Sequence, residues 1–404
     1  MFVTHLESAL DSSRFPPDRV HTVHLGRPLW VRYDLASVKK GLNPNQLAGR
    51  ASSLWRYHEL LPLPFDKERV TLGEGMTPVL PCPRLGRELG LTQLFIKDES
   101  QLPTGSFKSR GMAVAVSMAN HFGLKRLAIP TAGNAGGALA VYGARSGMDV
   151  FVFMPEDTPR INQLEAFLAG AHVFLINGLI TDCGRIVRDG TEKMGWFDMS
   201  TLKEPYRLEG KKTMGLELAE QFDWKLPDVI LYPTGGGTGL IGMWKAFGEL
   251  QELGWLKPGA LPRLISCQSD GCAPIVRAYE AGQRFAEPFA NAHTMASGLR
   301  VPAAVGDFMM LDAIRASGGC AIAGSESRIL EWMQRVTRLE GVAICPETAV
   351  CFDCLEQLAH AGKINPSERV VVFNTGAAQK YPEAVPLDLP RLDKNKPVPY
   401  EKLP

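Results

Sequence analysis

The feature that most constrains the fold is an alternation of short apolar segments with longer helical segments from residue 92 onward. Short strands separated by helices of roughly ten or more residues are typical of βαβ units, whose largely parallel sheets are buried on both faces. The predicted fold class is therefore α/β with open, mostly parallel sheets. We expect strands at 94–97, 127–130, 150–154, 172–176, 229–232, 264–268 and 370–373. Helices are expected at 107–122, 134–146, 159–169, 209–222, 239–253, 325–339 and 347–360.

The chain of 404 residues is long enough for more than one domain. We expect a small N-terminal appendage and connector over 1–68, which includes a strand near 28–33. A small domain is predicted over 105–210, inserted into a large domain formed by 69–104 and 211–381. The proline-rich tail, 382–404, is predicted to be an extended arm.

Charge and composition narrow the class of protein. The net charge of +1 gives no electrostatic reason to expect a nucleic acid or a membrane surface as partner. No apolar run reaches roughly 18 residues, and the N-terminus has no basic start followed by an apolar core, so we expect a cytoplasmic protein. The 8 cysteines are scattered through apolar segments and predict buried thiols. The single pair Cys351 and Cys354 cannot close a zinc site alone, so no metal is predicted.

In parallel sheets, ligands bind beyond the carboxyl ends of the strands, so the loops that follow the strands are the candidate site. The first such loop, 103–111, contains Lys108 next to Arg110 at the start of a predicted helix. A nearby cation and a helix N-terminus disfavour protonation of the amine, which suits a lysine that forms a Schiff base. Taken alone, this segment favours a solvated loop lysine, because lysine is common in loops.

A second loop, 234–239, is rich in glycine and lies between a predicted strand and a predicted helix. Successive glycines expose backbone N–H groups beside a helix N-terminus, which is an arrangement that binds phosphate. The spacing Gly237-x-Gly239-x-x-Gly242 also occurs in dinucleotide-binding proteins. A dinucleotide site also needs an acidic residue at the end of the next strand to bind the ribose. Here the next predicted strand is 264–268 and the first acid after it is Asp270, so nicotinamide binding is the weaker alternative.

Two further strand-end loops carry polar side chains. Asn134 lies in the small-residue loop 131–137, where its amide could contact a carboxylate or a ring hydroxyl, or could simply cap the following helix. Thr375 follows the last predicted strand and presents a hydroxyl at the sheet edge. If the ligand of a Schiff-base lysine contains a pyridine ring, a hydroxyl that faces the ring nitrogen leaves this nitrogen unprotonated, which favours elimination and replacement chemistry. An ordinary turn residue is the alternative for Thr375.

Together and in this order, these loops resemble the fold type II pyridoxal phosphate (PLP) enzymes of the tryptophan synthase β family, and most closely the threonine synthases. The resemblance implies that Lys108 forms the Schiff base with PLP and that Asn134 contacts its ring hydroxyl. It implies that Gly235, Gly236, Gly237 and Thr238 hold the cofactor's phosphate, and that Thr375 faces its ring nitrogen. The similar stretches are 73–78, 97–100, 103–111, 131–137, 205–213, 233–240, 298–302 and 373–376.

The resemblance also implies a reaction, in which O-phospho-L-homoserine and water give L-threonine and phosphate. Lys108 would then act as Schiff-base partner and as general acid and base. The substrate's phosphate needs a cationic pocket of its own. The expected substrate-binding residues are Thr104, Ser106, Lys203 and Arg207.

Alternatives remain because the sequence departs from the family pattern near these residues. The Asn-Ser that usually precedes the arginine is absent from 201–205, and Ser109 replaces the usual Asp after the lysine. A threonine/serine dehydratase, or another β-eliminating or β-replacing PLP enzyme, is therefore the main alternative. A PLP-binding regulatory protein without catalysis and a nicotinamide oxidoreductase are further alternatives. The expected partner is a small amino-acid substrate, and a homodimer is left open.

Overall fold

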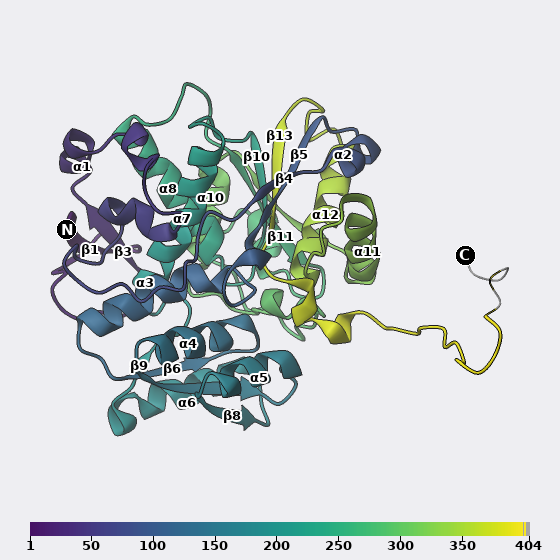
Figure 1. The fold of residues 1–404 in the computed structure, drawn as a ribbon. Helices are drawn as coiled ribbons and strands as arrows, with labels where there is room; N and C mark the ends of the chain where they lie inside the picture. The colour runs from purple at the N-terminus through teal and green to yellow at the C-terminus, as the bar shows by residue number, and fades with distance from the viewer. Residues whose placement is uncertain (399, 401–404) are drawn as a thin grey trace.

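The structure is a computed structural model that describes residues 1–398 and residue 400. Its N-terminal part forms a small antiparallel sheet in the order β2-β1-β3, and the predicted strand near 28–33 is confirmed as β3. Helix α1 and two short 3₁₀ helices follow and pack beside α8 and α7 in Figure 1. These elements are β1 (Val3–Ser8), β2 (Arg14–Phe15), β3 (Leu29–Tyr33), α1 (Leu35–Gly41), η1 (Pro44–Leu47) and η2 (Leu54–Leu60).

The largest sheet has six strands in the order β12-β11-β10-β13-β5-β4. All neighbouring pairs are parallel except β4 with β5. The strands β10 and β13 at its centre are almost wholly buried, as their uninterrupted apolar runs predict. The members are β4 (Val79–Pro81), β5 (Gln93–Asp98), β10 (Val229–Pro233), β11 (Arg263–Ser269), β12 (Cys320–Gly324) and β13 (Arg369–Asn374).

A separate sheet of four parallel strands has the order β8-β7-β6-β9 and lies in the lower part of Figure 1. Every strand predicted from residue 92 onward is present in one of the two sheets. The predicted α/β class with two mostly parallel sheets is therefore confirmed. The strands of the smaller sheet are β6 (Arg126–Pro130), β7 (Asp149–Pro155), β8 (His172–Ile176) and β9 (Phe197–Asp198).

Helices cover both large sheets. Each predicted helix is present, while α1, α2, α6, α9 and α10 are not among the predicted helices. The helices are α2 (Pro83–Leu89), α3 (Lys108–His121), α4 (Asn134–Arg145), α5 (Arg160–Leu168), α6 (Ile180–Met194), α7 (Tyr206–Gln221), α8 (Thr238–Leu253), α9 (Pro274–Glu280), α10 (Asp307–Ala316), α11 (Ile329–Glu340) and α12 (Pro346–His360). The short 3₁₀ helices are η3 (Glu99–Gln101), η4 (Ser297–Leu299), η5 (Glu326–Arg328), η6 (Ala378–Lys380) and η7 (Pro382–Ala384).

A buried ion network fixes the start of α3. The guanidinium of Arg110 donates to Glu99 at 2.5 Å and to Glu217 at 2.6 Å, and none of these side chains is exposed. Lys97 on β5 donates to the same Glu217 at 3.0 Å. Because buried charges are tolerated only when they are paired, this network ties β5, α3 and α7 together in one arrangement. Lys108, two residues before Arg110, is thereby held in place.

The pair Cys351 and Cys354 is free and buried in α12, as the core interpretation expected. After η7, the chain through residue 398 has no helix or strand and runs away from the body in Figure 1. Residues 399 and 401–404 of the predicted arm lie outside the described residues. Within the described part of the chain, no helix has the length and apolar character needed to cross a membrane.

Candidate active site

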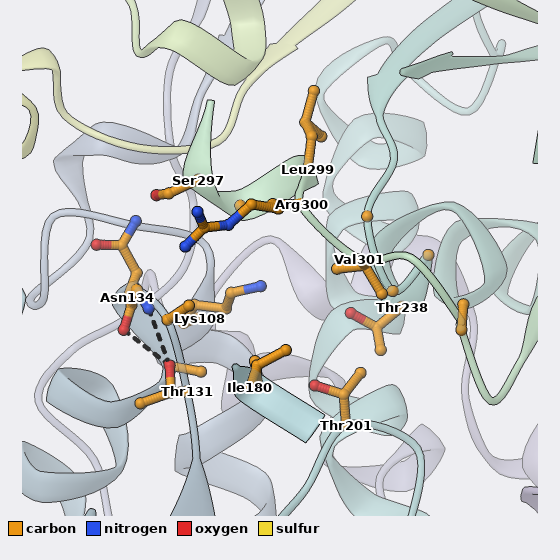
Figure 2. Close-up of a pocket in the computed structure, with 18 of the residues that line it drawn as sticks. Lys108, Thr131, Asn134, Ile180, Thr201, Thr238, Ser297, Leu299, Arg300 and Val301 are labelled. Carbon is orange, nitrogen blue, oxygen red and sulfur yellow. Dashed lines mark hydrogen bonds between the residues drawn. The ribbon is translucent and has the colours of Figure 1, made fainter. Parts of the chain in front are cut away.

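A cavity of about 280 Å³ lies where the strand-end loops of both large sheets meet. This volume is close to the lower end of the roughly 300–1,000 Å³ typical of small-ligand sites. Loops that follow β6, β10 and β13 all contribute to its wall, which is the location expected for parallel sheets. Figure 2 shows Lys108 between Asn134 and Thr131 on one side and Thr238 and Thr201 on the other.

Lys108 is the first residue of α3, and its amine lies 4.2 Å from the centre of the Phe107 ring. It forms no ion pair and no side-chain hydrogen bond within the described residues. Burial and the nearby Arg207 guanidinium lower the pKa of Lys108 to about 7, although Glu347 acts in the opposite direction. A large fraction of this amine is therefore neutral and nucleophilic near pH 7.

The cation that acts on Lys108 differs from the one that the sequence suggested. Arg110 was expected to disfavour protonation of the lysine, but its charge is compensated by Glu99 and Glu217. The cation that lowers the pKa of Lys108 is Arg207, at the start of α7. Distance along the sequence favours Arg110, because only the fold brings Arg207 of α7 next to α3.

The glycine loop lies between β10 and α8 and leaves room only for backbone. A Cβ atom on Gly235 would lie 2.2 Å from the carbonyl oxygen of Gly298, and one on Gly237 would lie 2.0 Å from Met310 Sδ. Gly237 also has a φ of +74°, a conformation that favours glycine. Gly235, Gly236, Gly237 and Thr238 line the cavity at the N-terminus of α8, so backbone N–H groups are available to an anion there.

Asn134 and Thr375 also reach the cavity. Asn134 begins α4, and its Nδ2 donates to the hydroxyl of Tyr381 at 2.9 Å while its Oδ1 accepts from Asn162 at 2.8 Å. The hydroxyl of Thr375 lies 3.7 Å from Cys345 Sγ. The four loops singled out in the sequence thus line one cavity.

The expected substrate-binding residues divide into two groups. Lys203 lines the cavity and donates to Asp198 at 3.3 Å. Thr104, Ser106 and Arg207 are buried and do not line it. Arg207 Nη1 donates to the carbonyl of Met199 at 2.6 Å, and the hydroxyl of Thr104 lies 2.7 Å from that of Ser109. The substrate roles of all four residues stay predictions.

Comparison with known proteins gives the family. Residues 70–376 match the family described as "Pyridoxal-phosphate dependent enzyme". The threonine synthase of Methanocaldococcus jannaschii is 34% identical over 366 residues, which are 90% of each chain. The threonine synthase of Methanosarcina acetivorans is 36% identical over 356 residues, 88% of this chain and 86% of the relative.

The chain belongs to the family of pyridoxal-phosphate-dependent enzymes. Solved structures of similar fold include maize serine racemase, with a TM-score of 0.64 and 21% identity over 75% of this chain and 88% of that one. They also include a threonine deaminase from Solanum lycopersicum, with a TM-score of 0.64 and 20% identity over 74% of this chain and 79% of that one. These likenesses confirm the fold of the type II PLP enzymes.

The residues present fit the cofactor of this family, pyridoxal phosphate. Lys108 has a partly neutral amine with no partner in the described residues, which suits an amine that bonds to the cofactor's carbonyl. The glycine loop lines the cavity and packs so closely that a Cβ at Gly235 would collide with Gly298 and one at Gly237 with Met310.

Sequence reasoning missed several residues of this PLP-family site. Glu347 in the first turn of α12 and Tyr381 after η6 both line the cavity. Arg300 does so too, and it donates to Asp157 at 2.9 Å. A signal existed for Glu347, because it is an acid directly before the largely apolar run 348–352. Tyr381 gave no comparable signal, since it lies beyond the last strand-end loop.

Proposed function

We propose that this protein is a threonine synthase that converts O-phospho-L-homoserine and water into L-threonine and phosphate. The observation that carries the proposal is the convergence of Lys108, the glycine loop and Asn134 on one cavity in a chain that matches threonine synthases over nearly its whole length. The amino-acid biosynthetic role and a cytoplasmic location are parts of the same proposal.

Within this proposal, the chain's own residues have distinct tasks. Bound PLP supplies a carbonyl that takes up an amine and a ring that withdraws electrons from the substrate's carbon atoms. The neutral amine of Lys108 removes a proton from the substrate carbons and returns it, because a pKa of about 7 allows both directions near neutral pH. Gly235, Gly236, Gly237 and Thr238 bind the cofactor's phosphate through backbone N–H groups.

The remaining assignments concern orientation and water. Asn134 is assigned to the ring hydroxyl and Thr375 to the ring nitrogen, which stays unprotonated beside a hydroxyl. Lys203, which lines the cavity, is assigned to the phosphate of the substrate. Arg207, Thr104 and Ser106, which do not line the cavity, are proposed as further substrate-binding residues. We further propose that residues 105–210 act as a small domain that closes over the substrate and excludes water until it is needed.

The test is release of inorganic phosphate from O-phospho-L-homoserine by the PLP-loaded protein, with threonine measured in the same samples. The proposal predicts one threonine for each phosphate. The formation of 2-oxobutanoate from threonine or pyruvate from serine, without phosphate release, would instead identify an eliminating enzyme of the same family. The substitution Lys203→Met is expected to raise KM for the phosphorylated substrate and to leave PLP affinity unchanged.

A further inference from the structure

Glu347 is a buried carboxylate that has no cationic partner among the described residues. Its side chain lines the cavity although the residue is only 4% exposed. One oxygen, Oε1, accepts from the backbone N–H of Gly298 at 2.8 Å and from the hydroxyl of Tyr381 at 3.0 Å. The other oxygen, Oε2, is buried and has no hydrogen-bond partner. Buried acceptors without partners are rare and call for an explanation.

The carboxylate is held firmly in its present position. A Cβ atom on Gly298 would lie 2.8 Å from Glu347 Oε1, so the loop packs directly against this oxygen. The donors around it also form a chain, because Asn162 donates to Asn134, Asn134 to Tyr381, and Tyr381 to Glu347. Every bond in this chain points toward the carboxylate and stabilises its negative charge without neutralising it.

The other acids next to the cavity are already compensated. Asp198 accepts from Lys203, and Asp157 accepts from Arg300. Glu347 is close enough to Lys108 to raise the lysine's pKa, so its charge acts at the position where the reactive amine lies. An amino-acid substrate must bring its own nitrogen to that position, and it arrives as an ammonium ion.

We propose that Glu347 is the residue that binds the ammonium group of the incoming amino acid, with Oε2 as the hydrogen-bond acceptor. Tyr381 and Gly298 act as positioning groups that orient this carboxylate. Amino acids are thereby selected over carboxylic acids of the same shape that lack the amine, because only a cationic donor satisfies the buried oxygen. This inference rests on the proposed cofactor site at Lys108, but it does not depend on which leaving group the substrate carries.

The substitution Glu347→Gln separates this role from a purely structural one. A glutamine keeps an amide oxygen for the N–H of Gly298 and the hydroxyl of Tyr381, and it removes only the charge and the free acceptor. Calorimetry on the PLP-loaded protein would compare L-2-aminobutanoate with butanoate as ligands. We expect at least tenfold weaker binding of the amino acid and less than a twofold change for butanoate. Glu192→Gln, on the exposed face of α6, is the matched control and should change neither.

A second readout follows the visible absorption band of the PLP-loaded protein as a function of pH. Removing the negative charge of Glu347 destabilises the protonated form of the lysine nitrogen. The pH at the midpoint of the absorption change should therefore be lower in Glu347→Gln than in the native protein. The other charged groups that act on Lys108 are Arg207 and Lys211 of α7, and the cavity wall also contains Lys203, Arg300 and the phenols of Tyr232 and Tyr381. All of these are unchanged in this variant. Tyr381→Phe, which removes one of the two bonds to Oε1, should shift the midpoint in the same direction by less.

Equal losses for both ligands in Glu347→Gln, or no loss for either, would overturn the inference. If Glu347→Gln does not fold, Tyr381→Phe still decides, because unchanged amino-acid binding and an unchanged midpoint in that variant contradict the positioning role. If the proposed reaction is wrong but the inference about Glu347 is right, the experiments give a different result. The protein would then discriminate the amino acid from butanoate and yet release no phosphate from O-phospho-L-homoserine.

Discussion

Two cations that are two residues apart have opposite environments in α3. Arg110 lies between two carboxylates, which raise its pKa despite complete burial. Lys108 is enclosed by protein with Arg207 as its strongest charged neighbour, and its pKa falls to about 7. The difference decides their roles, because a permanently charged guanidinium can only hold the fold together. An amine that is partly neutral near pH 7 can act as a nucleophile and a base.

The low pKa of Lys108 predicts the pH dependence of cofactor uptake. Since the amine reacts in its neutral form, the rate at which the PLP-free protein takes up PLP should rise between pH 6 and 8 and level off above it. Arg207→Met removes a positive charge and should raise the pH at which the rate reaches half its maximum. Arg145→Met, at an exposed position, should not change this pH. Stopped-flow absorbance measures these rates. A midpoint near the ordinary lysine value of about 10.4, or no response to Arg207→Met, would contradict the assignment.

At the scale of elements, the loops after parallel strands were predictable and some elements were not. Uninterrupted apolar runs such as 229–232 and 370–373 identify buried strands. The structure extends the first by one residue and the second by one residue at each end. Strand β9 has only two residues, and β12 consists largely of small residues, so neither has a recognisable period. Helix α6 is missing from the predictions although it is amphipathic, because its largely exposed polar face has the composition of a loop.

The glycine loop can be tested with one pair of substitutions. Gly235→Ala places a Cβ atom 2.2 Å from the carbonyl oxygen of Gly298, so the loop must move. We expect a loss of about 1–3 kcal/mol in the free energy of unfolding and at least tenfold weaker PLP binding. Gly248→Ala lies in α8 with open space around it and should stabilise the protein by about 0.5–1 kcal/mol. Urea unfolding and PLP titration would detect both effects, and equal PLP affinity in the two variants would contradict the phosphate cradle.

The ion network beneath α3 predicts a pH-dependent contribution to stability. Although burial opposes it, Arg110 and Lys97 lower the pKa of Glu217 to about 2. Since the folded value lies below the unfolded one, this group stabilises the fold above roughly pH 4.5, and the stabilisation is lost as the pH falls toward 2. Glu217→Gln should cost about 3–5 kcal/mol at pH 7. The difference in free energy of unfolding between the native protein and Glu217→Gln should become smaller below pH 4.5.

Thermal or urea unfolding at several pH values measures this difference directly. The exposed Glu287→Gln is the control and should change the free energy of unfolding by less than about 0.5 kcal/mol at every pH. A cost of Glu217→Gln that stays constant from pH 7 to pH 3 would show that the ionised carboxylate does not contribute as described.

At the scale of the whole molecule, the site depends on contacts between segments that are far apart in the chain. Tyr381 reaches Asn134, and the neighbouring Lys380 donates to Glu165 of α5 at 2.6 Å. On the other side of the cavity, Arg300 pairs with Asp157 after β7. The segment after β13 therefore connects the six-stranded sheet with helices of the four-stranded one. These pairs are separated by more than 140 residues in sequence, so no local pattern announces them.

This connection predicts different outcomes for two truncations. A chain that ends after Val385 loses only the arm that runs away from the body, and its melting temperature and PLP affinity should match the full chain. A chain that ends after Ala377 also loses the buried Tyr381 and the ion pair of Lys380. It should melt at a lower temperature and bind PLP at least tenfold more weakly. Equal behaviour of the two truncated chains would show that the segment 378–385 does not support the site.

Part of the candidate site was predictable from the sequence, because several of its residues lie in loops that follow strands. Asn134, Thr375 and the glycine loop follow strands directly, and Lys108 ends the segment that links β5 to α3. The topology of parallel sheets brings such segments together. Glu347 lies at a helix start and Tyr381 lies between two short 3₁₀ helices, so only packing across the two sheets brings them to the cavity. The buried position of Arg207 likewise follows from the packing of α7 against α3 and not from its own neighbours in sequence.

The central claim is that Lys108 is the lysine that bonds to PLP. Reduction of the PLP-loaded protein with borohydride, followed by peptide mass spectrometry, tests it most directly because the reduced link is permanent. The account predicts that the pyridoxyl phosphate mass appears on Lys108, and that Lys108→Ala carries none and lacks the visible absorption band. The buried Lys211, which flanks the same Phe107 ring, is the natural internal control. Label on Lys211 or on any other lysine, with Lys108 unmodified, would contradict the account.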